Sequence, residues 1–356
     1  MDLETLRHII ALGCLYPNNV HRVRMMLEKY ATPEEAWEHA ESERVVEAMG
    51  HAERELEFIA KHGIQTYYYR DDNYPYRLKQ CPDAPVLLFG KGNLRLNEGK
   101  FVSIVGTRTA SENGKELTRQ LVLDLAKRIP DITIVSGLAY GIDVAAHRAA
   151  LEAGVSTIIV PAHGLDRIYP TVHRQVAVEA LEKGGILTEY PSETEPDKIN
   201  FVARNRIVAG LADAVVIAES KLKGGSLITA CDANDYSRNL YAFPGRPKDI
   251  NSQGCNNLIR TNRAMLINSA EDLINDMQWQ SCAQPVQLEM EDLMADLDTV
   301  EKQLVKLVRT AEDGIHIDEV AEKMALPYAQ VAASMMVLEM SGFVKVLPGN
   351  MYRAIK

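Results

Sequence analysis

The sequence predicts a doubly wound α/β sheet, preceded by a small helical domain and followed by a winged-helix domain. Between residues 101 and 190, short apolar β-branched runs stop at glycine-bearing turns, and segments with helical spacing follow them. The alternation continues to about residue 277, and this spacing favours parallel strands joined by right-handed crossovers. The turns after Val105, Val135 and Val160 would then line one crevice at the carboxyl ends of the strands.

The composition is that of an ordinary globular protein with more than one domain. The chain has 356 residues, of which 46% are hydrophobic and 25% charged, and this length allows a large core with one or two small domains. No apolar run approaches the roughly 20 residues that span a bilayer, and the first residues lack the features of a signal peptide. We therefore expect a cytoplasmic protein without a membrane partner.

Neither a metal site nor a cofactor is expected. The sequence has five cysteines, which lie too far apart for metal or redox motifs: Cys14, Cys81, Cys231, Cys255 and Cys282. We expect buried, reduced thiols. The first glycine turn, which begins at Gly106, does not have the G-x-G-x-x-G fingerprint of dinucleotide-binding proteins.

The distribution of charge favours a basic surface, although the formal net charge is −10. An acidic average taken alone argues against a nucleic-acid partner. However, residues 198–263 contain ten Lys or Arg against five Asp or Glu, whereas residues 289–301 contain six acidic residues and no basic one. The acidic total can therefore conceal a basic face.

The first part of the chain predicts helices. Residues 3 to about 60 carry apolar residues at helical spacing, and Thr32-Pro33 is a typical helix start. We expect a domain of the SAM or helix-hairpin-helix kind over 1–62. Residues 64–96 contain a tyrosine run and several prolines, which favours an extended segment on the edge of the main sheet.

The sheet domain is predicted over 63–277, and an acidic linker over 278–297. The expected strands are 101–105, 132–135, 156–160, 186–189, 214–218, 239–243 and 264–267.

The last segment, 298–356, predicts three helices and a two-stranded hairpin, which is a winged-helix pattern. Its candidate recognition helix, 327–341, carries Glu339 and no Lys or Arg, so it is poorly suited to phosphate contacts. We favour a protein-contact or accessory role for this domain over the reading of DNA.

Several glycine turns are candidates for binding an anion. The turn from Gly106 to Arg108 combines backbone amides, a helix start and a guanidinium that can donate to phosphate oxygens. Ser136-Gly137 opens a second turn, and Gly224 opens another. We expect His147, in the helix after the second turn, to pack in the core. A basic, glycine-rich groove without a metal cluster or a nucleophile–base pair suits binding better than catalysis.

Seven motifs follow one another across about 101–267: GTR, SGLAYGID, GLDRIYP, GGILTEYP, FVARNRIVAGLAD, GGSLITA and FPG. Their order resembles that of the DNA-processing protein A (DprA/Smf) family. The resemblance implies an extended Rossmann-like domain that binds single-stranded DNA, forms homodimers and loads the recombinase RecA during natural transformation. It also implies DNA contacts for Arg108 and Arg174, although relatives commonly have Asn-Lys where this chain has His173-Arg174.

We therefore expect a site for single-stranded DNA and no catalytic residue. Basic side chains, with Arg108, Arg174, Arg204 and Arg206 at the centre, would neutralise phosphates, and turn amides at Gly106, Gly137 and Ser226 would donate hydrogen bonds. The candidate residues are Gly106, Thr107, Arg108, Ser136, Gly137, His173, Arg174, Arg204, Asn205, Arg206, Lys223, Gly225 and Ser226.

Two alternatives belong to other classes of protein. One is a nucleoside monophosphate hydrolase of a related Rossmann-like superfamily, whose members resemble one another in a P-G-G-x-G-T-x-x-E signature. This chain has Pro244-Gly245-Arg246-Pro247 instead, without the second glycine and the glutamate. The other is a ligand-sensing transcription regulator built on the winged helix. The absence of Lys and Arg from the recognition helix argues against this alternative.

Overall fold

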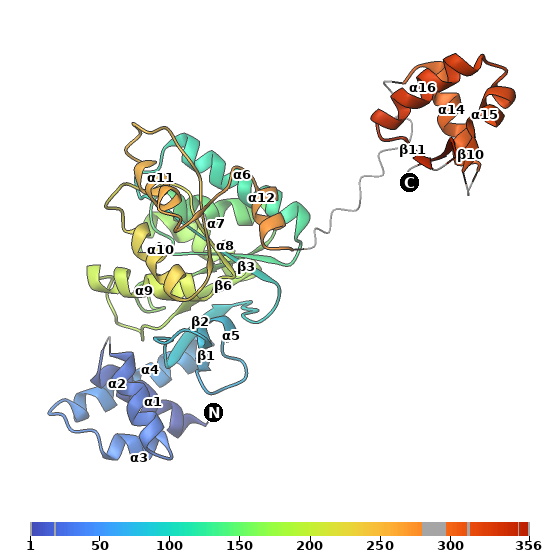
Figure 1. The fold of residues 1–356 in the computed structure, drawn as a ribbon. Helices are drawn as coiled ribbons and strands as arrows, with labels where there is room; N and C mark the ends of the chain where they lie inside the picture. The colour runs from blue at the N-terminus through green and yellow to red at the C-terminus, as the bar shows by residue number, and fades with distance from the viewer. Residues whose placement is uncertain (1, 18, 280–296, 312–313, 348, 355–356) are drawn as a thin grey trace. The chain divides into compact units, whose positions relative to one another are not determined.

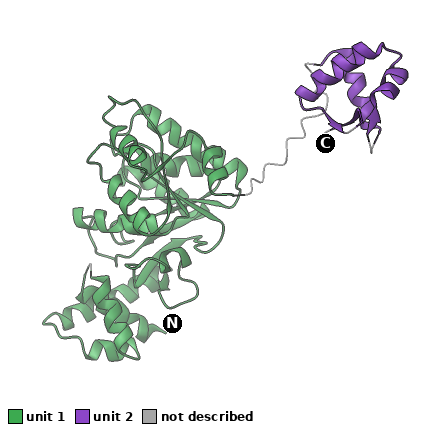
Figure 2. Cartoon of the chain, in the orientation of Figure 1, with its two compact units in different colours: residues 1–283 green, residues 284–356 purple. Residues whose placement is uncertain are grey.

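The computed structural model describes the chain except for residues 1, 18, 280–296, 312–313, 348 and 355–356. It divides into two compact units, residues 1–283 and 284–356 (Figure 2). Most of the predicted acidic linker lies outside the described residues.

A nine-stranded sheet forms the centre of the first unit (Figure 1), with the strand order β1-β2-β6-β5-β4-β3-β7-β8-β9. The strands are Gln65–Tyr68 (β1), Leu87–Gly92 (β2), Lys100–Val105 (β3), Ile132–Ser136 (β4), Ser156–Ile159 (β5), Gly185–Thr188 (β6), Ala214–Ile217 (β7), Asn239–Ala242 (β8) and Met265–Leu266 (β9). The strands from β6 to β9 pair in parallel, which confirms the predicted doubly wound sheet. The segment before them adds β1 and β2 antiparallel at one edge, as expected.

Helices cover both faces of the sheet because alternate residues of each strand point to opposite sides. In β3, Val102 and Ile104 join one core cluster, and Phe101 and Val105 join the other. The first face is covered by α6 (Glu112–Arg128), α7 (Ile142–Ala153), α8 (Arg174–Lys183) and α12 (Ala270–Asp276). The second is covered by α5 (Tyr76–Lys79), α9 (Lys198–Gly210), α10 (Ser226–Asp235) and α11 (Gln253–Arg260).

The N-terminal part folds into helices, as predicted: α1 (Leu3–Leu15), α2 (Val20–Lys29), α3 (Pro33–Glu38) and α4 (Val45–His62). Thr32 caps α3 by accepting a hydrogen bond from the amide of Glu35 at 3.2 Å, so the expected helix start is present. The carboxylate of Glu55, on α4, accepts hydrogen bonds from the amide and hydroxyl of Ser192, which follows β6. Burial raises the pKa of Glu55, whereas the hydrogen bonds from Ser192 lower it.

The second unit has the winged-helix architecture that the sequence predicted. Its elements are β10 (Ile315–His316), α14 (Thr299–Arg309), α15 (Ile317–Met324), α16 (Tyr328–Met340), β11 (Val344–Leu347) and β12 (Met351–Ala354). The sequence missed β10, because a two-residue strand is too short to show an alternating pattern.

Two further observations concern membranes and thiols. None of the helices that the structure describes is both long and apolar enough to cross a membrane. Cys81 and Cys255 are buried free thiols, as predicted, whereas Cys14 and Cys231 are only half-buried. Cys282 lies outside the described residues.

Candidate nucleic-acid interface

The predicted crevice falls where the strand order changes direction. In the sheet, β3 has β4 on one side and β7 on the other, and the chain reaches β7 only after adding β4, β5 and β6. Ligands bind outside the carboxyl ends of parallel strands at such a switch point. The turns after β3, β4, β5 and β7 all open on this edge, and they carry most of the predicted site residues.

Arg108 lies close to two aromatic rings, those of Phe201 and Tyr169. Arg108 is exposed in the turn after β3, and its Cζ lies 4.9 Å from the centre of the Phe201 ring, on the first turn of α9. The ring of Tyr169, from the loop after β5, is centred 6.0 Å from that of Phe201 and is 46% exposed. An exposed cation beside aromatic faces suits a flexible strand that offers phosphates and unstacked bases.

A second aromatic contact lies at the turn after β4. Tyr140, which is 51% exposed, packs edge-on against His173 with ring centres 5.0 Å apart. His173 is buried, and its Nδ1 donates to the carbonyl oxygen of Leu138 at 2.9 Å. The next residue, Arg174, begins α8 and is exposed. In this chain, His173 therefore supports the turn and Arg174 supplies the charge.

Arg204 lies beneath this surface rather than on it. Its side chain is buried, and its Nη1 donates to the carbonyl oxygens of Val160 and, at 2.9 Å, of Gly137. Burial lowers the pKa of Arg204, while the nearby carboxylate of Asp143 opposes that shift. Asn205 is half-buried and accepts a hydrogen bond from Nε of Arg204 at 3.3 Å. Arg204 thus ties α9 to the ends of two strands.

Arg206 is not brought together with Arg108 and Phe201. Its side chain is 14% exposed, its Nη2 donates to the carboxylate of Glu189, and its Nη1 donates to the carbonyl oxygen of Asp83 at 2.6 Å. The predicted grouping of Arg206 with the phosphate-binding side chains therefore needs correction, because its charge is engaged in a buried ion pair.

One amide of the first turn is already engaged. Thr107 donates its backbone N–H to the carbonyl oxygen of Glu219 at 2.8 Å. The Glu219 carboxylate accepts hydrogen bonds from the backbone N–H and the hydroxyl of Ser111, the residue that caps α6. A carboxylate of the protein thus occupies the helix start that the sequence predicted for a phosphate.

The second turn has a similar arrangement around Asp143. The buried Asp143 carboxylate accepts a long hydrogen bond from the amide of Ala139, at 3.4 Å. Burial raises the pKa of Asp143, whereas the charge of Arg204 and the amides of Ala139 and Gly137 lower it. The expected donation from Gly137 to a phosphate is therefore corrected in the same way. Ser136 is buried and donates its hydroxyl to the carbonyl oxygen of Ile104 at 2.6 Å.

The glycines of these turns permit close packing. A Cβ on Gly106 would lie 2.5 Å from Cγ1 of Ile142, and a Cβ on Gly137 would lie 2.2 Å from Nη1 of Arg204. Alanine at either position would displace the neighbouring element. Their evident role is to let α7 and Arg204 approach the strand ends.

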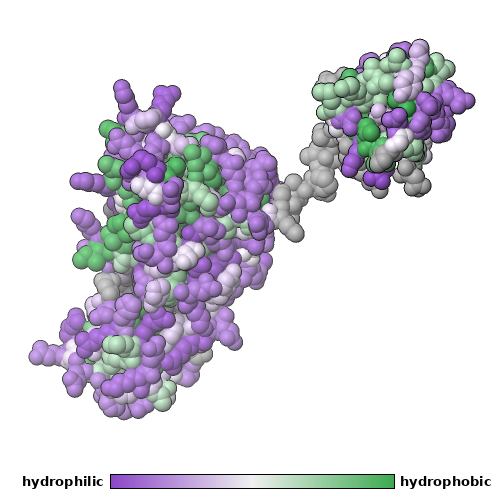
Figure 3. All heavy atoms as spheres, viewed as in Figure 1, coloured by the Kyte–Doolittle hydropathy of each residue, from purple (hydrophilic) through white to green (hydrophobic). Residues whose placement is uncertain are grey.

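The turn after β7 is exposed at the start of α10, where the amides of Leu227 and Ile228 already donate to the carbonyl oxygens of Gly224 and Gly225. Gly225 is the N-cap and has no side-chain capping bond, and both Gly225 and Lys223 are exposed. The hydroxyl of the buried Ser226 donates to that of Ser220 at 2.8 Å. Since α10 packs beside α9, this turn lies next to the helix that carries Phe201. Figure 3 shows hydrophobic side chains on the surface near α9, where Ile199 is 67% exposed.

His163 holds the loop that carries Tyr169. Its Nδ1 donates to the carbonyl oxygen of Gly164 at 2.8 Å, and its Nε2 accepts the amide of Tyr169 at 3.2 Å. This pair of bonds requires the neutral ring, and burial lowers the pKa of His163 accordingly. The Tyr169–Pro170 peptide bond in this loop is cis.

The sequence-based list omitted the three aromatic residues Tyr140, Tyr169 and Phe201. The sequence does contain a signal for them, because each belongs to one of the seven motifs. In addition, Phe201 lies three residues before Arg204, on the same side of a helix. No group of three or more His, Cys, Asp or Glu that could hold a metal occurs among the residues described.

A mostly parallel sheet with an antiparallel edge and an added winged-helix domain define an extended Rossmann-like protein. The chain belongs to the DNA recombination-mediator protein A family. The model of that family matches residues 65–278, and the model of the DprA winged-helix domain matches residues 289–350.

Relatives and solved structures agree with this assignment. The DNA processing protein DprA of Streptococcus pneumoniae is 41% identical over 209 residues, which cover 59% of this chain and 73% of the relative. Its X-ray structure matches with a TM-score of 0.65 and 33% identity, over 76% of this chain and 97% of that one. The structure of DNA processing protein A from Helicobacter pylori, reported for its single-stranded DNA binding mode, matches with a TM-score of 0.54 and 34% identity, over 60% of this chain and 95% of that one.

Proposed function

We propose that this protein binds single-stranded DNA across the crevice at the ends of β3, β4 and β5. The observation that carries the proposal is the contact between Arg108 and Phe201, with the exposed ring of Tyr169 beside it. The single-stranded DNA binding mode of the Helicobacter pylori relative supports it.

In this proposal, one set of side chains contacts the phosphates and another stacks on the bases. The exposed side chains of Arg108 and Arg174 neutralise backbone phosphates, and the exposed side chain of Lys223 extends the basic path. Bases stack on Phe201, Tyr169 and Tyr140. Because phosphates and ring faces occur in every nucleotide, binding is largely indifferent to sequence.

Titration of a fluorescently labelled oligothymidylate tests the proposal. The parent chain should bind it, and Arg108→Ala should bind it less tightly, by an amount that shrinks as salt is raised. Equal affinity of the parent and Arg108→Ala at low salt would overturn the assignment of Arg108.

We propose that the crevice binds without catalysing a reaction. His163 and His173 stabilise the fold, since the Nδ1 of each donates to a backbone carbonyl oxygen. Incubation with nucleoside monophosphates should release no free base, and turnover that disappears in Arg108→Ala would favour the hydrolase alternative.

We further propose that the protein acts in the cytoplasm and loads RecA onto incoming strands during natural transformation. The family assignment supports this role. On strands coated with single-strand-binding protein, the chain should shorten the lag before RecA filaments form. An unchanged lag would count against RecA loading while leaving DNA binding intact.

We also propose a homodimer that forms through β9. This edge strand exposes Met265 and Leu266, at 41% and 46%, and so presents both apolar side chains and unpaired backbone groups. Light scattering should give twice the monomer mass for the parent and the monomer mass for Leu266→Lys. A monomeric parent at micromolar concentration would contradict the proposal.

Finally, we propose four segments for the chain: a helical domain (1–62), a sheet domain (63–277), an acidic linker (278–297) and a winged-helix domain (298–356). The two compact units support a boundary within the proposed linker, since they separate after residue 283.

A further inference from the structure

The carboxyl edge of the sheet offers a strand in the crevice two directions in which to continue. From the turn of Arg108, after β3, the edge runs past β7 to β8 on one side and past β4 and β5 to β6 on the other. Because the backbone of DNA is a polyanion, the charge of the turns along each direction decides which of them a strand can follow.

The turn after β6 is acidic. Residues 189–197 contain four Asp or Glu and no Lys or Arg. Cations close to this turn are already engaged by it, since Arg54 lies 3.6 Å from the carboxylate of Glu193 and Arg167 donates to the carboxylate of Glu195 at 3.2 Å. This side of the edge is therefore unfavourable for a phosphate backbone.

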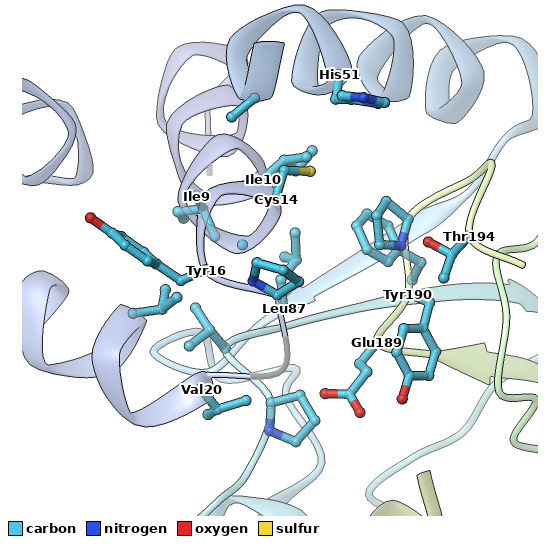
Figure 4. A pocket seen from close by; sticks show the side chains of 18 of the residues that line it. Ile9, Ile10, Cys14, Tyr16, Val20, His51, Leu87, Glu189, Tyr190 and Thr194 are labelled. Atoms are coloured by element: carbon cyan, nitrogen blue, oxygen red, sulfur yellow. The ribbon is translucent and has the colours of Figure 1, made fainter. Parts of the chain in front are cut away.

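The same turn borders a cavity of about 450 Å³ beside the N-terminal helices (Figure 4). In Figure 4, Glu189 lies on one side of the cavity, and Ile10 and Cys14 of α1 lie on the other. Arg44 also lines it, but its guanidinium donates to the carbonyl oxygen of Leu15 at 3.1 Å. The cavity therefore does not extend a basic path from the crevice.

The turns in the opposite direction are basic. Four exposed cationic side chains follow the two strands there: Lys221 and Lys223 after β7, and Arg246 and Lys248 after β8. None of the four forms an ion pair with a residue that the structure describes. Their charges are therefore available to a polyanion.

The carboxylate of Asp249, in the loop after β8, is engaged within that loop. It accepts hydrogen bonds from the hydroxyl of Ser252 at 2.7 Å and from the amide of Asn251 at 3.1 Å. These hydrogen bonds lower the pKa of Asp249, and the charge of Arg246 adds to the effect. The loop still has a positive excess, because it carries Arg246 and Lys248 against one carboxylate.

Hydrogen bonds fix the loop after β8 and join it to the neighbouring turns. The side-chain amide of Asn256 donates to the carbonyl oxygen of Gly245 at 2.9 Å and accepts from its N–H at 3.1 Å. Nδ2 of Asn251 donates to the carbonyl oxygen of Thr109, in the turn after β3, at 3.0 Å. The carbonyl oxygen of Asn251 accepts the amide of Ser220, after β7, at 2.7 Å. The turns after β3, β7 and β8 thus form one connected surface.

We propose that the loop after β8 is a second phosphate-binding arm of the DNA site, in which Arg246 and Lys248 hold a strand that leaves the crevice past β7. The inference rests on the proposed function, because the crevice positions the strand. The loop contributes charge and no aromatic ring, so it adds phosphate contacts without reading bases. Only a strand long enough to reach from the crevice to the loop gains affinity from it.

Binding of two lengths of labelled oligothymidylate to the full chain, measured by anisotropy, tests this arm. A strand of about 6 nucleotides should bind equally to the parent and to the double variant Arg246→Gln, Lys248→Gln, whereas a strand of about 20 should bind the variant more weakly. Two lost phosphate contacts reduce the slope of log affinity against log salt by about 1.4 for single strands. For the long strand, the advantage of the parent should therefore shrink about sevenfold when salt is raised about fourfold.

The matched control is the double variant Arg148→Gln, Lys183→Gln, which also removes two exposed charges, one from α7 and one from the last turn of α8. It should bind both strands like the parent. The inference would be overturned by equal affinity of the parent and the loop variant for the long strand, by an equal loss at both lengths, or by an equal loss in the control. A parent that bound neither strand would overturn the proposed function, and this inference with it.

Discussion

The guanidinium of Arg108 lies 4.9 Å from the centre of the Phe201 ring, although one residue follows β3 and the other begins α9. In the proposed function, Arg108 contacts a phosphate and Phe201 stacks on a base of the same nucleotide.

Replacement of Phe201 by alanine should weaken binding of single-stranded DNA. The loss of one stacking partner costs about 1–3 kcal/mol, so the dissociation constant of an oligothymidylate, measured by anisotropy, should rise roughly 5- to 150-fold. Phe201→Trp should retain most of the affinity. Phe58→Ala is the control, because Phe58 is a half-buried residue of α4, and an equal effect of both alanines would argue against stacking on Phe201.

Removal of Arg108 should make binding less sensitive to salt. Each neutralised phosphate contributes about −0.7 to the slope of log affinity against log salt for single strands, so Arg108→Ala should reduce the slope by about 0.7. Arg108→Lys should keep the slope but lose the planar contact with the ring. Arg148, exposed on α7, is the control position, where alanine should leave the slope unchanged.

Arg204→Met should destabilise the fold before it affects DNA contacts. The carbonyl oxygens of Gly137 and Val160 would lose their donor, at a cost of about 1–3 kcal/mol for each. Denaturant unfolding measures this loss. Arg174→Met removes an exposed guanidinium, so it should change the unfolding free energy by less than about 0.5 kcal/mol while weakening DNA binding. An unfolding midpoint of Arg204→Met equal to that of the parent would refute the supporting role.

The buried His147 should make stability depend on pH. Its Nδ1 donates to the hydroxyl of Thr157 at 2.7 Å, and its burial lowers its pKa to about 3. Below about pH 6.5 the unfolded chain binds a proton that the folded chain does not. Stability should therefore decrease as the pH falls from about 6.5 towards 3, by up to about 1.4 kcal/mol per pH unit.

His147→Gln should flatten that decrease, as measured by denaturant unfolding at a series of pH values. The control is His62→Gln, because His62 is exposed at the end of α4. A parent and a His147→Gln variant with the same pH dependence would show that His147 is not the group responsible.

The sheet and its crevice could be predicted because their signals are local. Each run such as Ser103–Val105 ends at a glycine turn and precedes a helix, and parallel pairing brings the turns to one edge. The burial of His147 in the core also follows from its position on an apolar helix, and it was predicted correctly.

The direction of the arginines on α9 was harder to predict. Residues two apart on a helix are separated by about 200° around the helix axis, so they point to nearly opposite sides. Arg204 and Arg206 therefore could not both face the crevice. Which of them turns towards Glu189 depends on tertiary packing. The carboxylate that fills the start of α6 comes from Glu219, which follows β7 and becomes a neighbour of Ser111 only in the folded sheet. Such long-range partners leave no local pattern in the sequence.

Competition between single-stranded and duplex DNA for the purified chain tests the central claim most directly. A labelled single strand bound to the parent should be displaced by an unlabelled single strand of the same length far more readily than by the corresponding duplex, since only unstacked bases can reach Phe201 and Tyr169. The preference should largely disappear in the Phe201→Ala, Tyr169→Ala double variant. Equal displacement by the two competitors would contradict the account.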